Sequence, residues 1–232
     1  SNFLKLIHDH HKNIKLIVSR SSSFEIKKKF QDSLVGRTVN FEIFPLNFAE
    51  FLEFKSYKFV KNKVYTAKKI EELTKLVKEF VLFGGYPKIV LTEAIEKKER
   101  LLQQIIDTYI LKDIKDLANI KDIDKFNKLV EILSEQSGNI LNVQEIAILA
   151  GFARQTVESY LFILENTYVI KLVKPFHKNL RSELFRMPKI FFYDTGIQQM
   201  LWLKTLQKEV LGSVFETAVF AELVKKYAKE NI

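Results

Sequence analysis

Three stretches in the middle of the chain carry apolar residues at steps of three and four, which is the repeat of a helix with one buried face. They cover residues 70–81, 95–117 and 123–133, and the sequence Gly84-Gly85-Tyr86-Pro87 separates the first from the second. A glycine pair followed by proline ends a helix, so a turn is predicted there. Residues 66–138 are therefore predicted to be a helical linker with these apolar residues in its core.

The part of the chain before this linker, residues 1–65, carries signals of both strands and helices. Residues 14–18 are an apolar run that ends in a polar cluster, as a buried strand does before a loop. Ser22 and Glu25 have the spacing of a capping box and predict a helix over residues 24–34. Residues 38–44 alternate enough for a second strand. This part is therefore predicted to be α/β.

A helix-turn-helix pattern follows the linker. Asn142 can cap a helix that runs to Ala150, Gly151 permits a sharp turn, and helical spacing resumes over residues 153–167. Residues 169–173 and 189–193 come next as two strand-like segments that flank a polar, basic stretch, which is how a winged helix is completed. Residues 139–205 are predicted to be a winged-helix domain, so that the whole chain is α+β.

The basic stretch of this domain has the composition of a phosphate-binding surface. Residues 171–189 hold six basic side chains and one acidic side chain, Glu183, for a local charge of +5 (6 − 1). Lysine and arginine in such a wing are expected to contact the nucleic-acid backbone. The candidates are Lys171, Lys174, Lys178 and Arg181.

The second helix of the pattern offers little for reading bases. Its exposed positions would include Arg154 and Gln155, whose side chains can pair with base edges, but also Glu158, which would face phosphates unfavourably. Packing of the winged helix against a protein is therefore an equal alternative to DNA binding.

The net charge is +9, from 37 Lys and Arg against 28 Asp and Glu, and it is unevenly distributed. Residues 1–68 carry +7 (13 − 6), residues 69–138 carry −1 (12 − 13), and residues 139–232 carry +3 (12 − 9). A positive charge at both ends makes an acidic partner such as DNA or RNA plausible.

The residues that several kinds of catalytic or binding site need are absent from this sequence. The chain has no cysteine and no G-x-x-x-x-G-K-[ST] phosphate-binding loop, and its triplet Asp194-Thr195-Gly196 occurs once, whereas an aspartic protease needs two such carboxylates. His8, His10 and His11 lie on a short polar run, which is typical of solvated surface. No catalytic residue and no metal site are predicted. The apolar runs are too short to span a membrane, so a soluble, cytoplasmic protein without a membrane partner is expected.

Spaced motifs along the chain resemble those of a family of prokaryotic AAA-like ATPases that carry an uncharacterised C-terminal domain. Residues 45–52 read PLNFAEFL, similar to the family's P-L-S-F-x-E-F-L signature. The family's G-G-[FY]-P, K-N-x-R-x-E-L, Y-D-x-G and G-x-x-x-E motifs have counterparts at residues 84–87, 178–184, 193–196 and 212–216.

The resemblance implies that residues 14–18 are a central strand of a nucleotide-binding sheet whose tip approaches the γ-phosphate. Ser19 and Ser21 match the family's pattern at that tip, whereas Arg20 stands where glycine is usual. Arg37 matches the arginine of a G-R pair that lies near nucleotide. ATP and Mg²⁺ are expected only in a full-length relative.

The resemblance also implies that the chain is cut at both ends, because family members begin with a P-loop and a Walker B strand and continue into a nuclease-like fold. Residues 1–65 would then be the distal part of a AAA-type core, and residues 206–232 the start of the nuclease-like domain. Such a chain is expected to be inactive alone and to self-associate through uncovered strand edges.

Two functions are compatible with these features. The chain is either a fragment or split subunit of a AAA-family ATP-binding protein that acts on nucleic acid or on a protein, or a non-enzymatic winged-helix module for DNA or protein binding. In the first case its partner includes the missing ATPase half.

Overall fold

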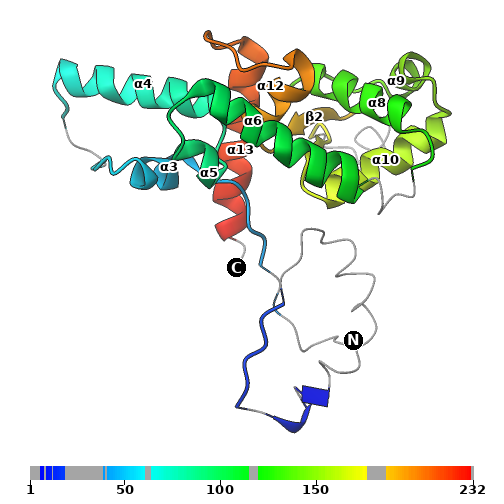
Figure 1. Ribbon diagram of the computed structural model, residues 1–232, viewed down its shortest axis with the longest axis horizontal. Helices are drawn as coiled ribbons and strands as arrows, with labels where there is room; N and C mark the ends of the chain where they lie inside the picture. The colour runs from blue at the N-terminus through cyan, green and yellow to red at the C-terminus, as the bar shows by residue number, and fades with distance from the viewer. Residues whose placement is uncertain are drawn as a thin grey trace.

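The structure is a computed structural model of the 232-residue chain. It describes residues 6–7, 9–11, 13–18, 39, 41–60, 64–114, 120–176 and 187–230. Most of the described chain is helical, with one two-stranded antiparallel sheet (Figure 1). The architecture is therefore α+β.

The predicted N-terminal strands are not formed. Residues 14–18 have an irregular backbone and exposed side chains, and so do Val39 and residues 41–43. A strand needs a neighbouring strand to satisfy its backbone hydrogen bonds, and no described segment pairs with either stretch. The prediction of two strands is wrong for the described residues, and the predicted helix over residues 24–34 lies outside them.

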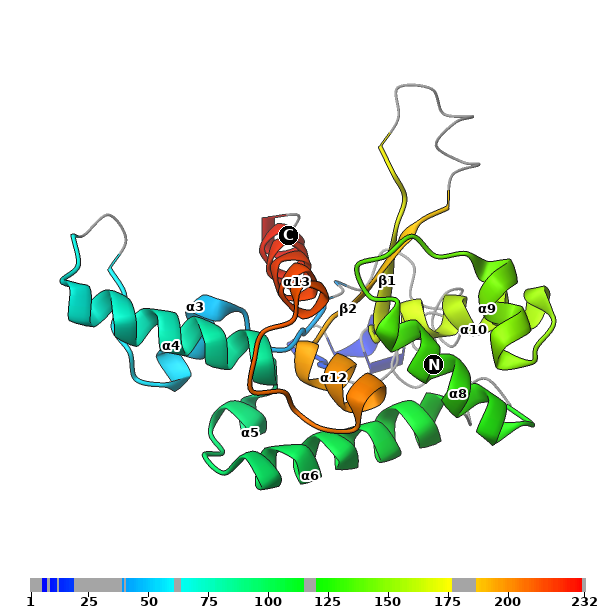
Figure 2. The same cartoon turned by 90° about the horizontal axis from the view of Figure 1, so that it is seen from above.

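The predicted helices of the middle of the chain are confirmed as α4 (Ala67–Phe83) and as α6 (Ile95–Ile105) continued by the π-helix η1 (Ile106–Asp113), with the short α5 (Pro87–Val90) between them. Helix α3 (Phe48–Phe54) precedes them and was not predicted. The predicted break lies between α4 and α5, where Gly84 has a φ of +77°. In both views α3 and α4 form one end of the molecule, and α6 runs along one face (Figures 1 and 2).

The π-helix continues the apolar face of α6. Leu102, Ile106, Ile110 and Ile114 follow one another at steps of four and are each at most 2% exposed. A step of four overshoots the α-helical turn of 3.6 residues, and the wider π-helical turn brings these residues back to the core. The sequence pattern predicts one continuous helix here and does not reveal the change of helix type.

The predicted helix-turn-helix is present as α9 (Val143–Ala150) and α10 (Arg154–Asn166), after α8 (Ile123–Glu135). The axes of α9 and α10 differ by 103°. Asn142 caps α9 by accepting a hydrogen bond from the Glu145 N–H, and Gly151 takes the left-handed conformation that the turn requires. The predicted cap and turn are both confirmed.

The two predicted strands pair as a hairpin, β1 (Ile170–Val173) with β2 (Lys189–Phe192), and Lys171 lies opposite Phe191. Residues 138–141 lie along the outer edge of β2, where the Gly138 N–H donates to the Ile190 carbonyl and the Leu141 N–H to the Pro188 carbonyl. After the hairpin come α12 (Thr195–Leu203) and α13 (Gly212–Glu230).

One main core joins α6, η1, α8, α9, α10, the hairpin and α12. A second, smaller cluster contains Phe51, Leu52, Phe80 and Val90, and it fixes α3 against α4 and α5. A third joins Val81 of α4 to Val214 and Ala218 of α13. Helix α13 therefore contacts the α3–α4 end of the molecule as well as the hairpin.

Candidate functional site: the hairpin groove and the polar joint

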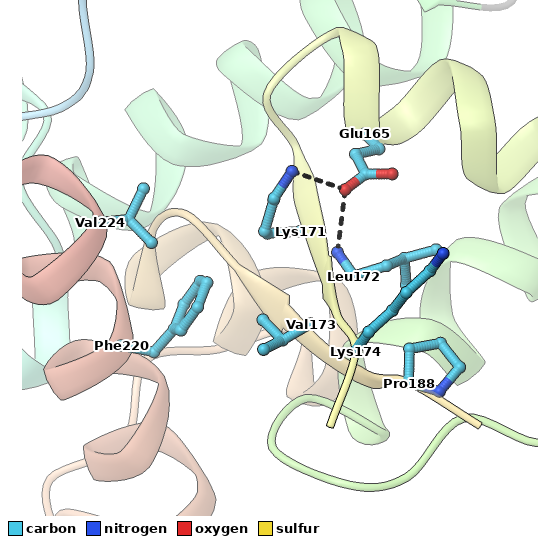
Figure 3. Close-up of a pocket in the computed structure, with 8 residues that line it drawn as sticks. All are labelled: Glu165, Lys171, Leu172, Val173, Lys174, Pro188, Phe220 and Val224. Carbon is cyan, nitrogen blue, oxygen red and sulfur yellow. Dashed lines mark hydrogen bonds and ion pairs between the residues drawn. The ribbon is translucent and has the colours of Figure 1, made fainter. Parts of the chain in front are cut away.

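The described part of the predicted wing borders an open groove between the hairpin and α13 (Figure 3). The groove has a volume of about 580 Å³ and an apolar floor that includes Val173, Phe220 and Val224. Lys171 and Lys174 stand on its rim, so the structure brings these two predicted nucleic-acid contacts together.

The two lysines differ in how free their charges are. The Lys171 ammonium lies 2.9 Å from the Glu165 carboxylate, which also accepts the Leu172 N–H at 3.2 Å (Figure 3). Glu165 therefore neutralises part of the positive charge and covers the open edge of β1. Lys174 is exposed, and among the described residues no acidic side chain pairs with it.

The predicted base-reading residues lie away from this groove. Arg154 and Gln155 begin α10 and are exposed, whereas Glu165 is near its end, about 16 Å along the helix axis. Arg154 lies 2.8 Å from Glu158 in an ion pair one helical turn away. Lys178 and Arg181 lie outside the described residues, so half of the predicted wing cannot be placed on this surface.

The four predicted nucleotide-proximal residues, Ser19, Arg20, Ser21 and Arg37, also lie outside the described residues. Among the residues that the structure does describe, no group of three or more His, Asp or Glu side chains could hold a metal ion. The same residues include no single helix long and apolar enough to cross a membrane, and α9 and α10 pass that test only as a bent pair.

A buried carboxylate, Asp194, lies where four distant segments of the chain meet. It caps α12 by accepting the Ile197 N–H at 3.0 Å, and it also accepts the Gly85 N–H at 2.8 Å. Burial raises the pKa of Asp194, although the backbone hydrogen bond from Gly85, the nearby Lys225 ammonium and the bonds from Ile197 and Gly196 oppose that rise. The carboxylate thus joins α12 to the turn after α4.

A buried lysine completes this arrangement from α13. Lys225 donates to the Leu46 carbonyl at 3.0 Å, and burial lowers the pKa of Lys225 while Asp194, Glu222 and Glu50 oppose the shift. Glu222, one turn earlier on α13, accepts the Phe48 N–H at 3.0 Å. We refer to Asp194, Lys225, Glu222 and the backbone of Gly85 and Leu46 as the polar joint.

The glycines of the turn after α4 are needed for this close packing. The Leu46 N–H donates to the Gly85 carbonyl at 2.8 Å, and a Cβ on Gly85 would overlap the Leu46 carbonyl oxygen. A Cβ on Gly84 would overlap the Asp194 carboxylate. The motif at residues 84–87 therefore serves a tight contact between segments and not only the end of a helix.

Aromatic contacts extend the joint toward the hairpin. Phe44 stacks on Tyr193 with ring centres 5.4 Å apart and meets Tyr168 edge-on at 5.7 Å. The Tyr168 hydroxyl lies 2.6 Å from a carboxylate oxygen of Glu42, and Tyr168 holds a left-handed backbone with φ of +58°. Residues 42–48 are thus attached to Tyr168 and Tyr193, which flank the hairpin, to the turn after α4 and to α13.

Sequence reasoning missed the joint as a unit. The spacing of Asp194-Thr195-Gly196 suggests a protease triplet and little else, whereas the structure shows a buried helix cap. The sequence did contain a signal of the polar joint in the family-like motifs at residues 45–52, 84–87 and 193–196, because these are the three segments that meet near Lys225. Nothing in local spacing predicts that a lysine 179 residues from Leu46 would bind its carbonyl.

Two family models match this chain in different places. A AAA domain model matches residues 1–52, and a model described as Domain of unknown function (DUF8612) matches residues 74–208. The chain is 30% identical to "Uncharacterized protein MJ1544" of Methanocaldococcus jannaschii over 99% of its own length and 51% of the relative's. It is 26% identical to an "Uncharacterized protein" of Haemophilus influenzae over 92% of its own length and 52% of the relative's.

The chain therefore spans about half the length of the curated relatives it matches. No solved structure matches it. The DUF8612 model covers more than half of the chain, from the middle of α4 to the segment after α12, and so includes Asp194, the helix-turn-helix and the hairpin. On this evidence the chain belongs to the family defined by the Domain of unknown function DUF8612, here preceded by a segment that resembles a AAA domain.

Proposed function

We propose that this chain is the distal part of a AAA-family ATP-binding protein, in which the DUF8612 region is a winged-helix module that acts on nucleic acid. The chain alone is inactive as an ATPase, because residues 1–232 contain no G-x-x-x-x-G-K-[ST] loop to hold the β- and γ-phosphates. The ATPase half supplies nucleotide binding, and the module changes its position or affinity with nucleotide state.

The observation that carries this proposal is the way the AAA-matching segment ends. Its last residues bind the DUF8612-matched region through the Leu46 contact to Gly85, and they bind α13, which follows that region, through the Leu46 contact to Lys225 and the Phe48 contact to Glu222. A rigid attachment of this kind transmits a movement of the ATPase half to the module, whereas a flexible linker would not. The polar joint is then the coupling element.

The hairpin groove supports nucleic acid as the target. Lys174 is exposed beside Lys171, and the sequence between β1 and β2 adds Lys178, Arg181 and Arg186. Backbone phosphates are the ligands that such a cluster prefers, and binding of this kind weakens as salt increases. The ion pair of Arg154 with Glu158 argues against base reading by α10, so recognition is expected to be independent of sequence.

A non-enzymatic protein-binding module is the second candidate. It is favoured by Ile148 and Leu149, which lie at the end of α9 and are 71% and 51% exposed. A recognition helix pair that meets DNA would present polar side chains there, whereas a protein partner could bury these two residues.

DNA binding by this chain separates the two candidates. The affinity of the chain for duplex DNA should fall steeply as the salt concentration is increased. The variant Lys171→Glu/Lys174→Glu/Lys178→Glu/Arg181→Glu should no longer bind duplex DNA. A control with the same change of charge, Lys88→Glu/Lys97→Glu/Lys112→Glu/Lys128→Glu, changes exposed lysines of other helices and should bind nearly as well as the wild type. Absence of duplex binding at low salt would remove the nucleic-acid function and leave the protein-binding one.

ATP hydrolysis tests the other half of the proposal. The full-length Methanocaldococcus jannaschii relative should hydrolyse ATP with Mg²⁺, and its rate should change when duplex DNA is added. The part of it that matches this chain, expressed alone, should not hydrolyse ATP. Hydrolysis by that part alone, or no hydrolysis by the full relative, would contradict the proposal.

A further inference from the structure

A basic and aromatic surface lies between the two family-matched segments. Residues 55–69 connect α3 to the first turn of α4, and they contain six lysines and no acidic residue. This end of α4 is the end of the molecule farthest from α9 and α10 in both views (Figures 1 and 2). The surface is thus separate from the hairpin groove.

The described residues of this connection are held in a defined shape. The Tyr65 hydroxyl binds both backbone groups of Val60, at 2.6 Å from its nitrogen and 3.0 Å from its carbonyl oxygen. The Phe59 and Tyr65 rings stack at 5.8 Å with an angle of 10° between their planes. Phe59 is nevertheless 49% exposed, so part of the ring remains open to solvent.

Three lysines lie close to these rings in the sequence, Lys58 directly before Phe59, and Lys68 and Lys69 three and four residues after Tyr65. Lys58, Lys68 and Lys69 are exposed, and no ion pair joins them to an acidic side chain in the part of the chain that the structure describes. Lys68 and Lys69 also occupy the first turn of α4, which has no acidic residue and whose backbone N–H groups already create a positive potential. Lysine there weakens the helix, so these positions cost stability unless an anion is bound.

We propose that Lys58, Phe59, Tyr65, Lys68 and Lys69 form a binding surface for single-stranded nucleic acid. The lysines contact the phosphates, and a base stacks on the open part of the Phe59 ring. This surface does not depend on the proposed ATPase role or on the hairpin, because it uses other residues, which lie before and at the start of α4.

A phospholipid bilayer is the competing ligand, because Val60 and Val64 are 54% and 95% exposed beside the lysines. The residues between the two valines are Lys-Asn-Lys in the sequence, and such a segment does not enter hydrocarbon. Nucleic acid therefore fits the composition better than a membrane does.

The test measures binding of a labelled oligothymidylate to the whole chain by fluorescence anisotropy at several salt concentrations. Lys58→Gln/Lys68→Gln/Lys69→Gln should weaken binding. It should also reduce the slope of log affinity against log salt concentration by about 2, because each phosphate that a lysine no longer neutralises reduces that slope by about 0.7. Phe59→Leu should weaken binding about fivefold at every salt concentration and leave the slope unchanged. The two variants thus separate charge from stacking.

The control Lys88→Gln/Lys97→Gln/Lys112→Gln removes the same charge from exposed positions on other helices and should retain the slope and most of the affinity. Lys68→Gln/Lys69→Gln should also raise the melting temperature while it weakens binding, because it removes cations from a helix N-terminus. If the variant lost affinity because it unfolded, its melting temperature would fall together with its affinity.

Two results would overturn this proposal. One is oligothymidylate binding that the triple lysine variant weakens no more than its control does. The other is the absence of oligothymidylate binding together with sedimentation of the chain on phosphatidylglycerol vesicles, lost in the same variant. Failure of duplex binding by the hairpin variant has no bearing on either result, so the two proposals fail separately.

Discussion

Within the AAA-matching segment, the residues before Phe44 and those of helix α3 differ in how deeply their apolar side chains are buried. Ile17 and Ile43 are 84% and 92% exposed, and neither lies in a strand. Phe51 and Leu52, a few residues farther along, are at most 3% exposed and lie in a capped helix. The apolar residues are similar in kind, and only the second pair has partners in the described chain.

This difference shows that the end of a AAA-like segment can pack as part of the region that follows it. Asn47 and Glu50 form a capping box on α3, and Lys225 and Glu222 of α13 hold the backbone just before and at the start of that helix. The family boundary at residue 52 therefore falls inside a packed region. The predictions below test how firmly that region is joined and how loosely the preceding residues are held.

Removing the buried carboxylate should have the largest effect. Asp194→Ala leaves the Gly85 and Ile197 N–H groups without their acceptor and removes one of the anions near Lys225, and the loss should be about 3–5 kcal/mol of unfolding free energy. Urea unfolding followed by circular dichroism measures it. Asp122→Ala is the control, because Asp122 caps α8 in the same way but is exposed, and it should lose only about 1 kcal/mol. Equal losses would mean that Asp194 is only a cap.

A methyl group at the joint should have the next largest effect. Gly85→Ala places a Cβ against the Leu46 carbonyl and should cost about 2–3 kcal/mol, because that backbone cannot move without breaking its bonds to Gly85 and Lys225. Gly212→Ala, at the start of α13, meets no atom within 4 Å and should be close to neutral. Thermal melts of the two variants provide the comparison.

Because its pKa is raised, Asp194 should make the unfolding free energy depend on pH, and this effect should be smaller than those of the two substitutions above. Its folded-state pKa lies above the usual 3.8, so the folded chain binds more protons than the unfolded chain between the two values, and stability from this group falls as pH rises through that interval. The stability of the wild type relative to Asp194→Asn should therefore decrease as pH rises from about 4. A difference that increases with pH would show that the hydrogen bonds and Lys225 outweigh burial.

The smallest effect on stability is expected at Ile43, an exposed residue just before the polar joint. Ile43→Ser should change the unfolding free energy of this chain by less than about 0.5 kcal/mol, because Ile43 is 92% exposed. Ile89→Ser, at a fully buried position, should cost several times more. In a longer protein with the ATPase half present, Ile43→Ser should become destabilising, and an unchanged melt there would count against a strand partner in that half.

Features set by neighbouring residues could be predicted from the sequence. The spacing of apolar residues predicted α4 and α8, Asn142 and Gly151 predicted the cap and turn of the helix pair, and the two strands of the hairpin were predicted within one residue. Each of these depends on contacts between residues close together in the chain.

Features that depend on distant partners could not be predicted in the same way. Residues 14–18 have a strand-like composition but no strand beside them among the described residues, so composition alone gave the wrong structure. The basic residues of the wing were identifiable, yet the groove beside them depends on Phe220 and Val224 of α13, which lie far along the chain from β1. The polar joint required three segments and α13 to meet, which no local pattern encodes.

The long sequence separation within the joint also affects the order of folding during synthesis. Leu46 leaves the ribosome 179 residues before Lys225, the residue that binds its carbonyl. At about 5–20 residues per second, that interval is about 10–40 s, longer than a small helical domain needs to fold. The Leu46 carbonyl therefore has no Lys225 to bind it until α13 has been synthesised, and the segment before α3 can take its final position only then.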